Sequence, residues 1–231
     1  MTVHRLPSSM DRLAFGCGTL DAMLEGGIEA GCLTLLYGEA GTGKTTLCLL
    51  LARDVAKRGK KVIYLDTEGV SIERLRQIAG DDFETVAKNI LFSNIGSFDE
   101  QERMVDKAVK LAQGSVDVGM IVVDSISMHY RLTSREEDRG ERKSLAGQST
   151  KLTNLAREHS LPVVVTSQVY TDVETGTFEA LGGHALLHNA KLIVRIDKVA
   201  PGRRRAVLMK HRSLPEGLLA DFQLTSDGIS C

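Results

Sequence analysis

The chain has 231 residues, which suits one α/β domain with a sizeable core. Hydrophobic residues make up 42% and charged residues 26%, proportions that are ordinary for a soluble globular protein. The formal net charge is −1, so nothing global marks a nucleic-acid binder, and any phosphate contact must come from a local cluster. There is no apolar core of a signal peptide and no window near the roughly 18 apolar residues of a membrane span. We therefore expect a cytoplasmic protein without a membrane partner.

Short apolar, β-rich runs alternate with amphipathic helical segments along the chain. Strands are predicted at residues 33–37, 61–65, 90–92, 120–123, 162–166, 191–196, 206–210 and 219–224. Helices are predicted at residues 19–24, 44–58, 72–79, 99–111 and 143–159. Continuous apolar strands such as MIVVD and LPVVVTS indicate a sheet buried on both faces. The predicted fold class is α/β, a mostly parallel twisted sheet flanked by helices, with antiparallel C-terminal strands because the last strands follow one another without helices.

Three features lie outside this regular pattern. Residues 129–143 are nearly all polar, and residues 169–189 form a long segment with three glycines, so both are expected to be functional or mobile loops. The four cysteines, Cys17, Cys32, Cys48 and Cys231, show no paired ligand spacing. We expect reduced cysteines of the core rather than a disulfide or zinc framework.

The first predicted strand breaks at residues 38–45 into GEAGTGKT, which satisfies the pattern G-x-x-x-x-G-K-[ST]. Glycines let backbone N–H groups curl around phosphate oxygens, and the following helix adds unpaired donors and the positive end of its dipole. Lys44 should reach the β- and γ-phosphates, and the Thr45 hydroxyl should bind Mg²⁺. The alternative is a chance match in a glycine-rich turn. The segment is predicted to hold a nucleoside triphosphate through Gly38, Glu39, Ala40, Gly41, Thr42, Gly43, Lys44, Thr45 and Thr46.

Polar side chains end three other predicted strands. Asp124 follows GMIVV, the usual place for an acid that holds Mg²⁺ through water, although an acid can simply end a strand there. Asp66 and Glu68 follow VIYL, and one of them could orient and deprotonate the attacking water unless both serve only turn chemistry. Gln168 follows VVVTS, where an amide can sense the γ-phosphate or can be a solvated strand end.

The set GCGTLDAMLEGGIEAGCLTLLYGEAGTGKTT, YLDTEG followed by ERL, IVVDS and VVVTSQV resembles the ATPase core of the RecA/RadA recombinase superfamily. The resemblance implies a core domain at residues 15–231 after a short extension at residues 1–14, with ATP and Mg²⁺ as cofactors. It implies Glu68 as the catalytic glutamate beside Lys44, and Gln168 as the glutamine that couples nucleotide to DNA. It also implies that Arg74 packs on the adenine, and that the loops after Ser125 and after Gln168 face DNA.

Differences from the RadA-type sequence pattern indicate which group of the superfamily the chain resembles. RadA-type recombinases carry a helix-hairpin-helix domain and a Phe-x-x-Ala element before the core, and neither pattern is present here. The sequence KHR at residues 210–212 is similar to the archaeal RadB group and to KaiC-type ATPases, in which the matching lysine and arginine can face a neighbour's nucleotide. Alternate strand positions share a face, so Lys210 and Arg212 should point the same way.

Resemblance to the RadB group implies a protein that binds ATP and DNA, hydrolyses ATP very weakly and does not drive strand exchange alone. It implies a role in DNA recombination and repair on single-stranded or branched DNA, with a RadA-type recombinase and the Holliday junction resolvase as partners and a homo-oligomer as one assembly. The alternative is a KaiC-like signalling or scaffold ATPase that does not bind DNA.

Local clusters of basic residues are the candidate DNA contacts. Arg203, Arg204 and Arg205 form one cluster, for which DNA contact, a role toward the nucleotide in trans and a solvated edge strand are the alternatives. Arg131 and Arg135 lie in a loop of mixed charge, which is a poor phosphate groove. Aromatic residues make up only 4%, so DNA binding should be electrostatic and salt-sensitive rather than based on stacking. Two histidines in the second loop have no partners at ligand spacing and are not expected to bind metal.

Overall fold

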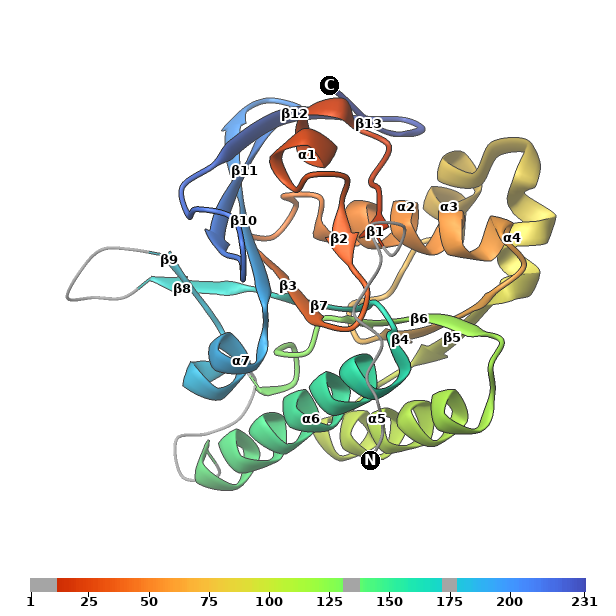
Figure 1. Ribbon diagram of the computed structural model, residues 1–231, viewed down its shortest axis with the longest axis vertical. Helices are drawn as coiled ribbons and strands as arrows, with labels where there is room; N and C mark the ends of the chain where they lie inside the picture. The colour runs from red at the N-terminus through yellow and green to blue at the C-terminus, as the bar shows by residue number, and fades with distance from the viewer. Residues whose placement is uncertain (1–11, 131–137, 172–177) are drawn as a thin grey trace.

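The computed structural model describes residues 12–130, 138–171 and 178–231, in which nine strands form one mixed sheet (Figure 1). Across the sheet the order is β13 (Gly228–Ser230), β12 (Leu219–Thr225), β11 (Arg203–Lys210), β10 (Leu192–Ala200), β3 (Leu33–Tyr37), β7 (Val163–Ser167), β6 (Val118–Asp124), β4 (Lys61–Asp66) and β5 (Ile90–Asn94). Strands β10, β3, β7, β6, β4 and β5 are parallel to one another. Strands β11, β12 and β13 pair antiparallel at the other edge. The predicted fold class is therefore confirmed.

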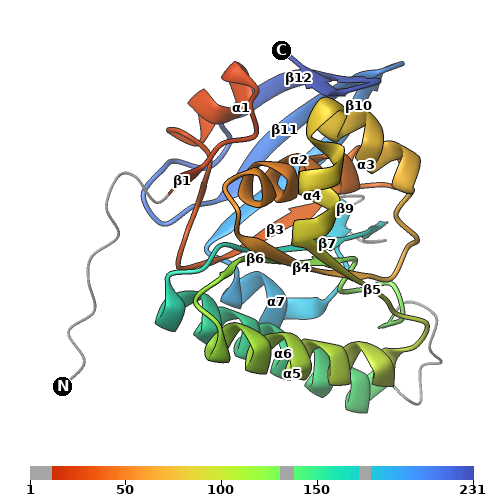
Figure 2. The ribbon, with the colours of Figure 1, turned by 90° about the vertical axis from the view of Figure 1, so that its right-hand side faces the viewer.

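Helices cover both faces of the sheet (Figure 2). One face carries α2 (Lys44–Lys57), α3 (Ile72–Ala79) and α4 (Phe83–Asn89), and the other carries α5 (Phe98–Gly114), α6 (Asp138–His159) and α7 (Gly183–Asn189). Helix α1 (Gly18–Met23) packs against β12. The remaining elements are β1 (Arg12–Leu13), β2 (Ile28–Glu29), β8 (Val169–Thr171), β9 (Phe178–Ala180) and the 3₁₀ turn η1 (Gly80–Asp82). In the described part of the chain, the helices include none that is long and apolar enough to cross a membrane.

The apolar strands have this composition because each one contributes to two core layers. Successive side chains of a strand point to opposite faces, so Val122 packs in the layer of α2 while Val123 packs in the layer of α5 and α6. Leu49 of α2 and Leu152 of α6 are both fully buried in these two layers. A strand with helices on both sides has no polar face, which accounts for the continuous apolar runs.

Parallel strands end at one edge of the sheet, and this edge positions the polar side chains. Strand β3 ends at Tyr37, β4 at Asp66, β6 at Asp124 and β7 at Ser167. Asp66 and Asp124 are register partners across β4 and β6. The predicted triphosphate loop and the predicted acids therefore lie at the same edge of the sheet, with β7 between β3 and β6.

Some elements were absent from the sequence prediction. Helix α4 and strand β13 are short, and their patterns are too brief to show a period. Helix α7 lies inside the segment 169–189 that is expected to be a loop, and α6 begins at Asp138 within the other predicted loop. The loop prediction is wrong for these parts.

The prediction of reduced cysteines is wrong for Cys17 and Cys231, which form a disulfide. Their Cα atoms lie 5.7 Å apart although the sequence separation is 214, because α1 packs against the C-terminal strands. Spacing along the chain cannot reveal such a pair. Cys32 and Cys48 are free and buried, as predicted, and burial raises the pKa of the Cys32 thiol to about 11.

Candidate nucleotide-binding site

The loop between β3 and α2 carries the predicted phosphate-binding residues. A Cβ at Gly38 would lie 2.3 Å from the carbonyl oxygen of Ile196 in β10, so only glycine fits where these strands diverge. Gly43 has a φ of 99°, a left-handed conformation that favours glycine. Because glycine has no side chain, Gly43 leaves the first N–H groups of α2 without a side-chain cap. These amides and the positive end of the α2 dipole suit a phosphate.

Lys44, the first residue of α2, lies over this loop with only 5% of its surface exposed. Its Nζ donates to the carbonyl oxygens of Gly38 and Glu39 at 2.8 and 2.9 Å. Burial lowers the pKa of Lys44, and the negative charges of Glu68 and Asp124 oppose that change. The ammonium group is thus held at the loop and within the field of both predicted acids.

Asp124 ends β6 and is fully buried. Its carboxylate accepts hydrogen bonds from the hydroxyls of Tyr64 at 2.8 Å and of Thr166 at 2.5 Å. Neither partner is predicted from the sequence, although each lies near the end of a predicted strand that could adjoin Asp124. Two neutral donors compensate in part for burying the carboxylate and fix its direction.

The structure separates the roles of the two acids after β4. Asp66 is buried, and its carboxylate accepts from the backbone N–H groups of Glu68, Gly69 and Val70 at 2.6–3.1 Å. It therefore serves turn chemistry, the alternative named for it above. Glu68 is exposed at the tip of that turn, and its Oε1 accepts from Nε2 of Gln168 at 3.1 Å. The predicted base and the predicted coupling amide, 100 residues apart in sequence, are in contact.

Arg74 lies beside the start of α2, where its Nη2 is 3.5 Å from the Thr46 hydroxyl. Its guanidinium also donates to the carbonyl oxygens of Ser226 and Gly228, at 2.6 and 3.2 Å, in the hairpin of β12 and β13. Ser71 caps α3 by accepting from the Arg74 backbone N–H at 3.2 Å. The guanidinium thus bridges α3 and the C-terminal hairpin beside α2, and its packing on adenine stays a prediction.

Comparisons with known proteins identify the family of the chain. The Rad51 family model matches residues 7–231. The chain is 41% identical to the DNA repair and recombination protein RadB of Methanococcoides burtonii, over 95% of this chain and 97% of that protein. It is 38% identical to the protein of the same name from Thermoplasma acidophilum, over 98% and 97%. The crystal structure of the RadB recombinase superposes with a TM-score of 0.81 at 38% identity, covering 94% of this chain and 98% of that one.

The chain belongs to the Rad51 family, within its RadB group. In this RadB-group chain, the structure does not place Lys210 and Arg212 as expected. Strand β11 ends at Lys210, so Arg212 lies beyond it, and its Nε donates to Glu29 Oε2 at 2.5 Å. Nζ of Lys210 donates to the carbonyl oxygens of Leu187 and His188, at 2.8 and 3.2 Å. The expectation that the two cations point the same way is wrong, because the strand stops between them and each binds a different element.

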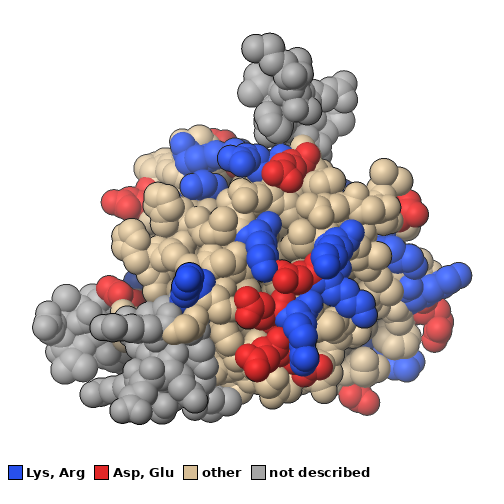
Figure 3. Space-filling view, turned by 90° about the horizontal axis from the view of Figure 1, so that it is seen from below, with Lys and Arg blue, Asp and Glu red and all other residues tan. Residues whose placement is uncertain are grey.

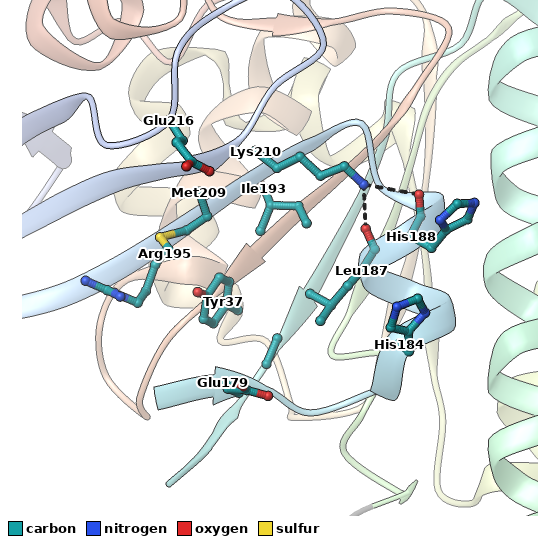
Figure 4. A pocket seen from close by; sticks show the side chains of 11 residues that line it. Tyr37, Glu179, His184, Leu187, His188, Ile193, Arg195, Met209, Lys210 and Glu216 are labelled. Carbon is teal, nitrogen blue, oxygen red and sulfur yellow. Dashed lines mark hydrogen bonds between the residues drawn. The ribbon is translucent and has the colours of Figure 1, made fainter. Parts of the chain in front are cut away.

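Lys210 also lines a cavity of about 660 Å³ between α7, β10 and β11. Figure 4 shows its ammonium turned toward the last carbonyls of α7, while Tyr37, Arg195 and Met209 line the opposite side. The C-terminal carbonyls of a helix attract a cation, which explains this position. A contact of Lys210 with a neighbour's nucleotide remains a prediction.

The three arginines of the β10–β11 hairpin differ from one another in the structure. Arg205 forms a double hydrogen bond with Asp221, at 2.7 and 2.8 Å. Arg204 donates from Nη2 to the carbonyl oxygen of Gly41 in the phosphate loop at 2.9 Å, a contact that the sequence analysis missed. Arg203 is exposed. The other candidates, Arg131 and Arg135, lie outside the described residues.

The face formed by α5 and α6 carries charges of both signs. Figure 3, seen from that side, shows Lys and Arg side chains interspersed with Asp and Glu. Lys151 of α6 and Asp106 of α5 form an ion pair of 2.5 Å across the two helices. Alternating charge of this kind is typical of a solvated helical face rather than of a phosphate groove.

Proposed function

We propose that this RadB-group chain is a slow, Mg²⁺-dependent ATPase that acts as an accessory factor in DNA recombination and repair. The observation that carries the proposal is the convergence at one sheet edge of the phosphate loop, buried Lys44, buried Asp124 and the Glu68–Gln168 pair. The names of the relatives as DNA repair and recombination proteins support the biological part.

The residues at this edge fit a triphosphate and its metal. Residues 38–43 offer amides, Lys44 offers a held cation, and the Arg74 guanidinium borders the adenine side. Thr45 would bind Mg²⁺ through its hydroxyl, and Asp124 would hold it through water. Asp124 suits this role because two hydroxyls orient its carboxylate and leave further lone pairs for water. Bound Mg²⁺ would neutralise charge that develops on the phosphates.

Glu68 is the base in this proposal, since it is exposed at the turn while Asp66 is committed to backbone amides. Glu68 would accept the proton of the attacking water on its carboxylate. Gln168 donates to Oε1 of that carboxylate, which orients the group and occupies one of the lone pairs available to the attacking water. Engagement of Glu68 by Gln168 is one physical reason to expect slow turnover. Gln168 also precedes β8, through which it would couple the nucleotide to the segment beyond.

DNA binding rests on the family and on exposed cations such as Arg203. We propose single-stranded or branched DNA as the ligand, held electrostatically, with a RadA-type recombinase and a Holliday junction resolvase as partners in the cytoplasm. Residues 1–14 would be an extension to the core at 15–231, and a homo-oligomer would complete the site with cations from a neighbour.

The nucleotide proposal is tested by calorimetric binding of a non-hydrolysable ATP analogue with Mg²⁺ and by phosphate release. Lys44→Ala should abolish binding, whereas Lys57→Ala, at the exposed end of the same helix, should not change it. Glu68→Gln should retain binding and lose hydrolysis. Hydrolysis by Glu68→Gln at the wild-type rate would remove Glu68 from the role of base.

The DNA proposal is tested on the same preparation with a four-way junction and a single strand at moderate salt, alone and with a RadA-type partner. Affinity should fall steeply as salt rises, and Arg203→Ala should weaken binding to every sequence alike. A chain that binds the ATP analogue but no DNA at moderate salt would favour the KaiC-like scaffold instead.

A further inference from the structure

The tip of the β10–β11 hairpin stands against the outer side of the phosphate loop. Strand β10 pairs with β3, and the carbonyl of Ile196 in β10 leaves no room for a side chain at Gly38. The hairpin turns at Pro201 and Gly202, and β11 returns from Arg203 beside β10. Side chains near this turn are therefore placed next to the loop by the pairing of the sheet.

Arg204 uses that position to contact the loop directly. Its Nη2 donates to the carbonyl oxygen of Gly41 at 2.9 Å. Its Nη1 donates to the carbonyl oxygens of Arg203 at 2.9 Å and Ala200 at 3.4 Å, which ties the same guanidinium to the turn of its own hairpin. The side chain is half-buried, and one guanidinium thus joins the hairpin to the apex of the phosphate loop.

We propose that Arg204 is a positioning residue for the phosphate cradle, acting through the Gly41–Thr42 peptide. The carbonyl of Gly41 and the N–H of Thr42 belong to one planar trans peptide, so they point in opposite directions. Arg204 holds the carbonyl outward and thereby directs the Thr42 N–H into the loop, where its contact with the Glu39 carbonyl is long, at 3.4 Å. A charged donor on the carbonyl also polarises the peptide and strengthens that N–H as a donor to phosphate.

This inference rests on the proposed nucleotide binding and assigns Arg204 to the nucleotide site rather than to DNA. The neighbouring arginines are placed differently, because Arg205 is engaged by Asp221 and Arg203 is exposed. Among the three consecutive arginines, the hydrogen bond to the phosphate loop comes from Arg204.

The test compares Arg204→Ala, Arg204→Gln, Arg204→Lys and the control Arg157→Ala, an exposed arginine of α6, in the full chain. Calorimetry measures affinity for a non-hydrolysable ATP analogue with Mg²⁺, and thermal unfolding without nucleotide measures stability. Loss of a charge-assisted hydrogen bond should weaken binding by about ten-fold in Arg204→Ala. Arg204→Lys, which keeps the charge, should recover part of that loss, whereas Arg204→Gln, which keeps donors without charge, should recover less. Arg157→Ala should bind the analogue within about two-fold of wild type.

Each other result decides against the inference. Wild-type affinity in Arg204→Ala overturns it while leaving the proposed function intact. If Arg204→Ala lowers the melting temperature and the affinity in proportion, and Arg204→Lys restores neither, Arg204 is a structural contact and the inference is overturned. If Arg204→Ala weakens junction binding and leaves nucleotide affinity unchanged, Arg204 is a DNA contact and the inference is overturned. Failure of the wild-type chain to bind the analogue, or equal binding by Lys44→Ala, overturns the proposed function itself.

Discussion

The parallel half of the sheet and the antiparallel C-terminal half are built on different principles. In β3, β7, β6 and β4, buried apolar side chains fill both faces, and the candidate site residues lie at or just after the strand ends. In β11 and β12, charged side chains occur along the strands and bind to the chain's own carbonyls and carboxylates. Position along a buried strand therefore indicates function, whereas a charge in the C-terminal half says little until its partner is known.

The largest difference between the two halves is expected in the free energy of unfolding after loss of an apolar side chain. Leu36→Ala removes a fully buried side chain of β3, and it should lower the free energy of unfolding by about 2–5 kcal/mol, through lost transfer energy and a cavity. Leu219→Ala in β12, where 57% of the leucine is exposed, should cost at most about 0.5 kcal/mol. Denaturant unfolding followed by circular dichroism measures both, and equal losses would contradict the distinction.

A smaller loss of stability is expected when a hydrogen bond of buried Asp124, in the parallel half, is removed. Tyr64→Phe removes one of the two hydroxyls that, among the described residues, donate to buried Asp124, and the Thr166 hydroxyl remains. Leaving a buried acceptor short of a donor should cost about 1–3 kcal/mol. Tyr170→Phe is the matched control, because its hydroxyl donates to exposed Glu179 at 2.8 Å where water can replace it. Equal unfolding midpoints for the two variants would show that Asp124 does not depend on Tyr64.

These residues also show what could be predicted from sequence. Lys44 and Asp124 are predicted because phosphate chemistry demands fixed spacing after a strand, and the structure places both buried at one sheet edge. The fold class follows from uninterrupted apolar runs. The residues alone leave the choice between Asp66 and Glu68 open because both follow one strand, and the resemblance selects Glu68. The turn geometry adds that Asp66 accepts hydrogen bonds from three backbone amides.

Contacts between distant parts of the chain could not be predicted from the sequence, for a different reason. The pairing of Cys17 with Cys231 and the contact of Arg204 with Gly41 depend on which strands become neighbours. A local pattern fixes the elements but not their order, so Arg204 resembled its neighbours in sequence and differs from them in space.

His211, between β11 and β12, should make the free energy of unfolding depend on pH. Its Nδ1 accepts from the backbone N–H groups of Ser213 and Leu214, both at 3.1 Å, which requires the neutral ring. Burial lowers the pKa of His211 below its ordinary value, with Glu29 and Glu25 opposing that change and Arg12 and Arg212 adding to it.

Because the unfolded chain then binds this proton more readily than the folded chain, the free energy of unfolding should fall as pH drops through about 6.5. His211→Gln should make that slope shallower, and His159→Gln, at an exposed helix end, should leave it unchanged. Urea unfolding at a series of pH values measures the slope, and an identical slope in His211→Gln would exclude this histidine as the source.

The smallest effect is expected where the C-terminal half is most charged. Arg205 and Asp221 face each other on paired strands, and their hydrogen bonds hold the pKa of Asp221 below its usual value. Both side chains are exposed, so water and salt compete with the pair and its loss should scarcely change the melting temperature. The Asp221 titration, followed by NMR, should nevertheless move upward in Arg205→Ala, because the partner that favours the carboxylate is gone. A large drop in melting temperature that persists at high salt would mean that this pair carries stability as the buried half does, and the contrast between the two halves would fail.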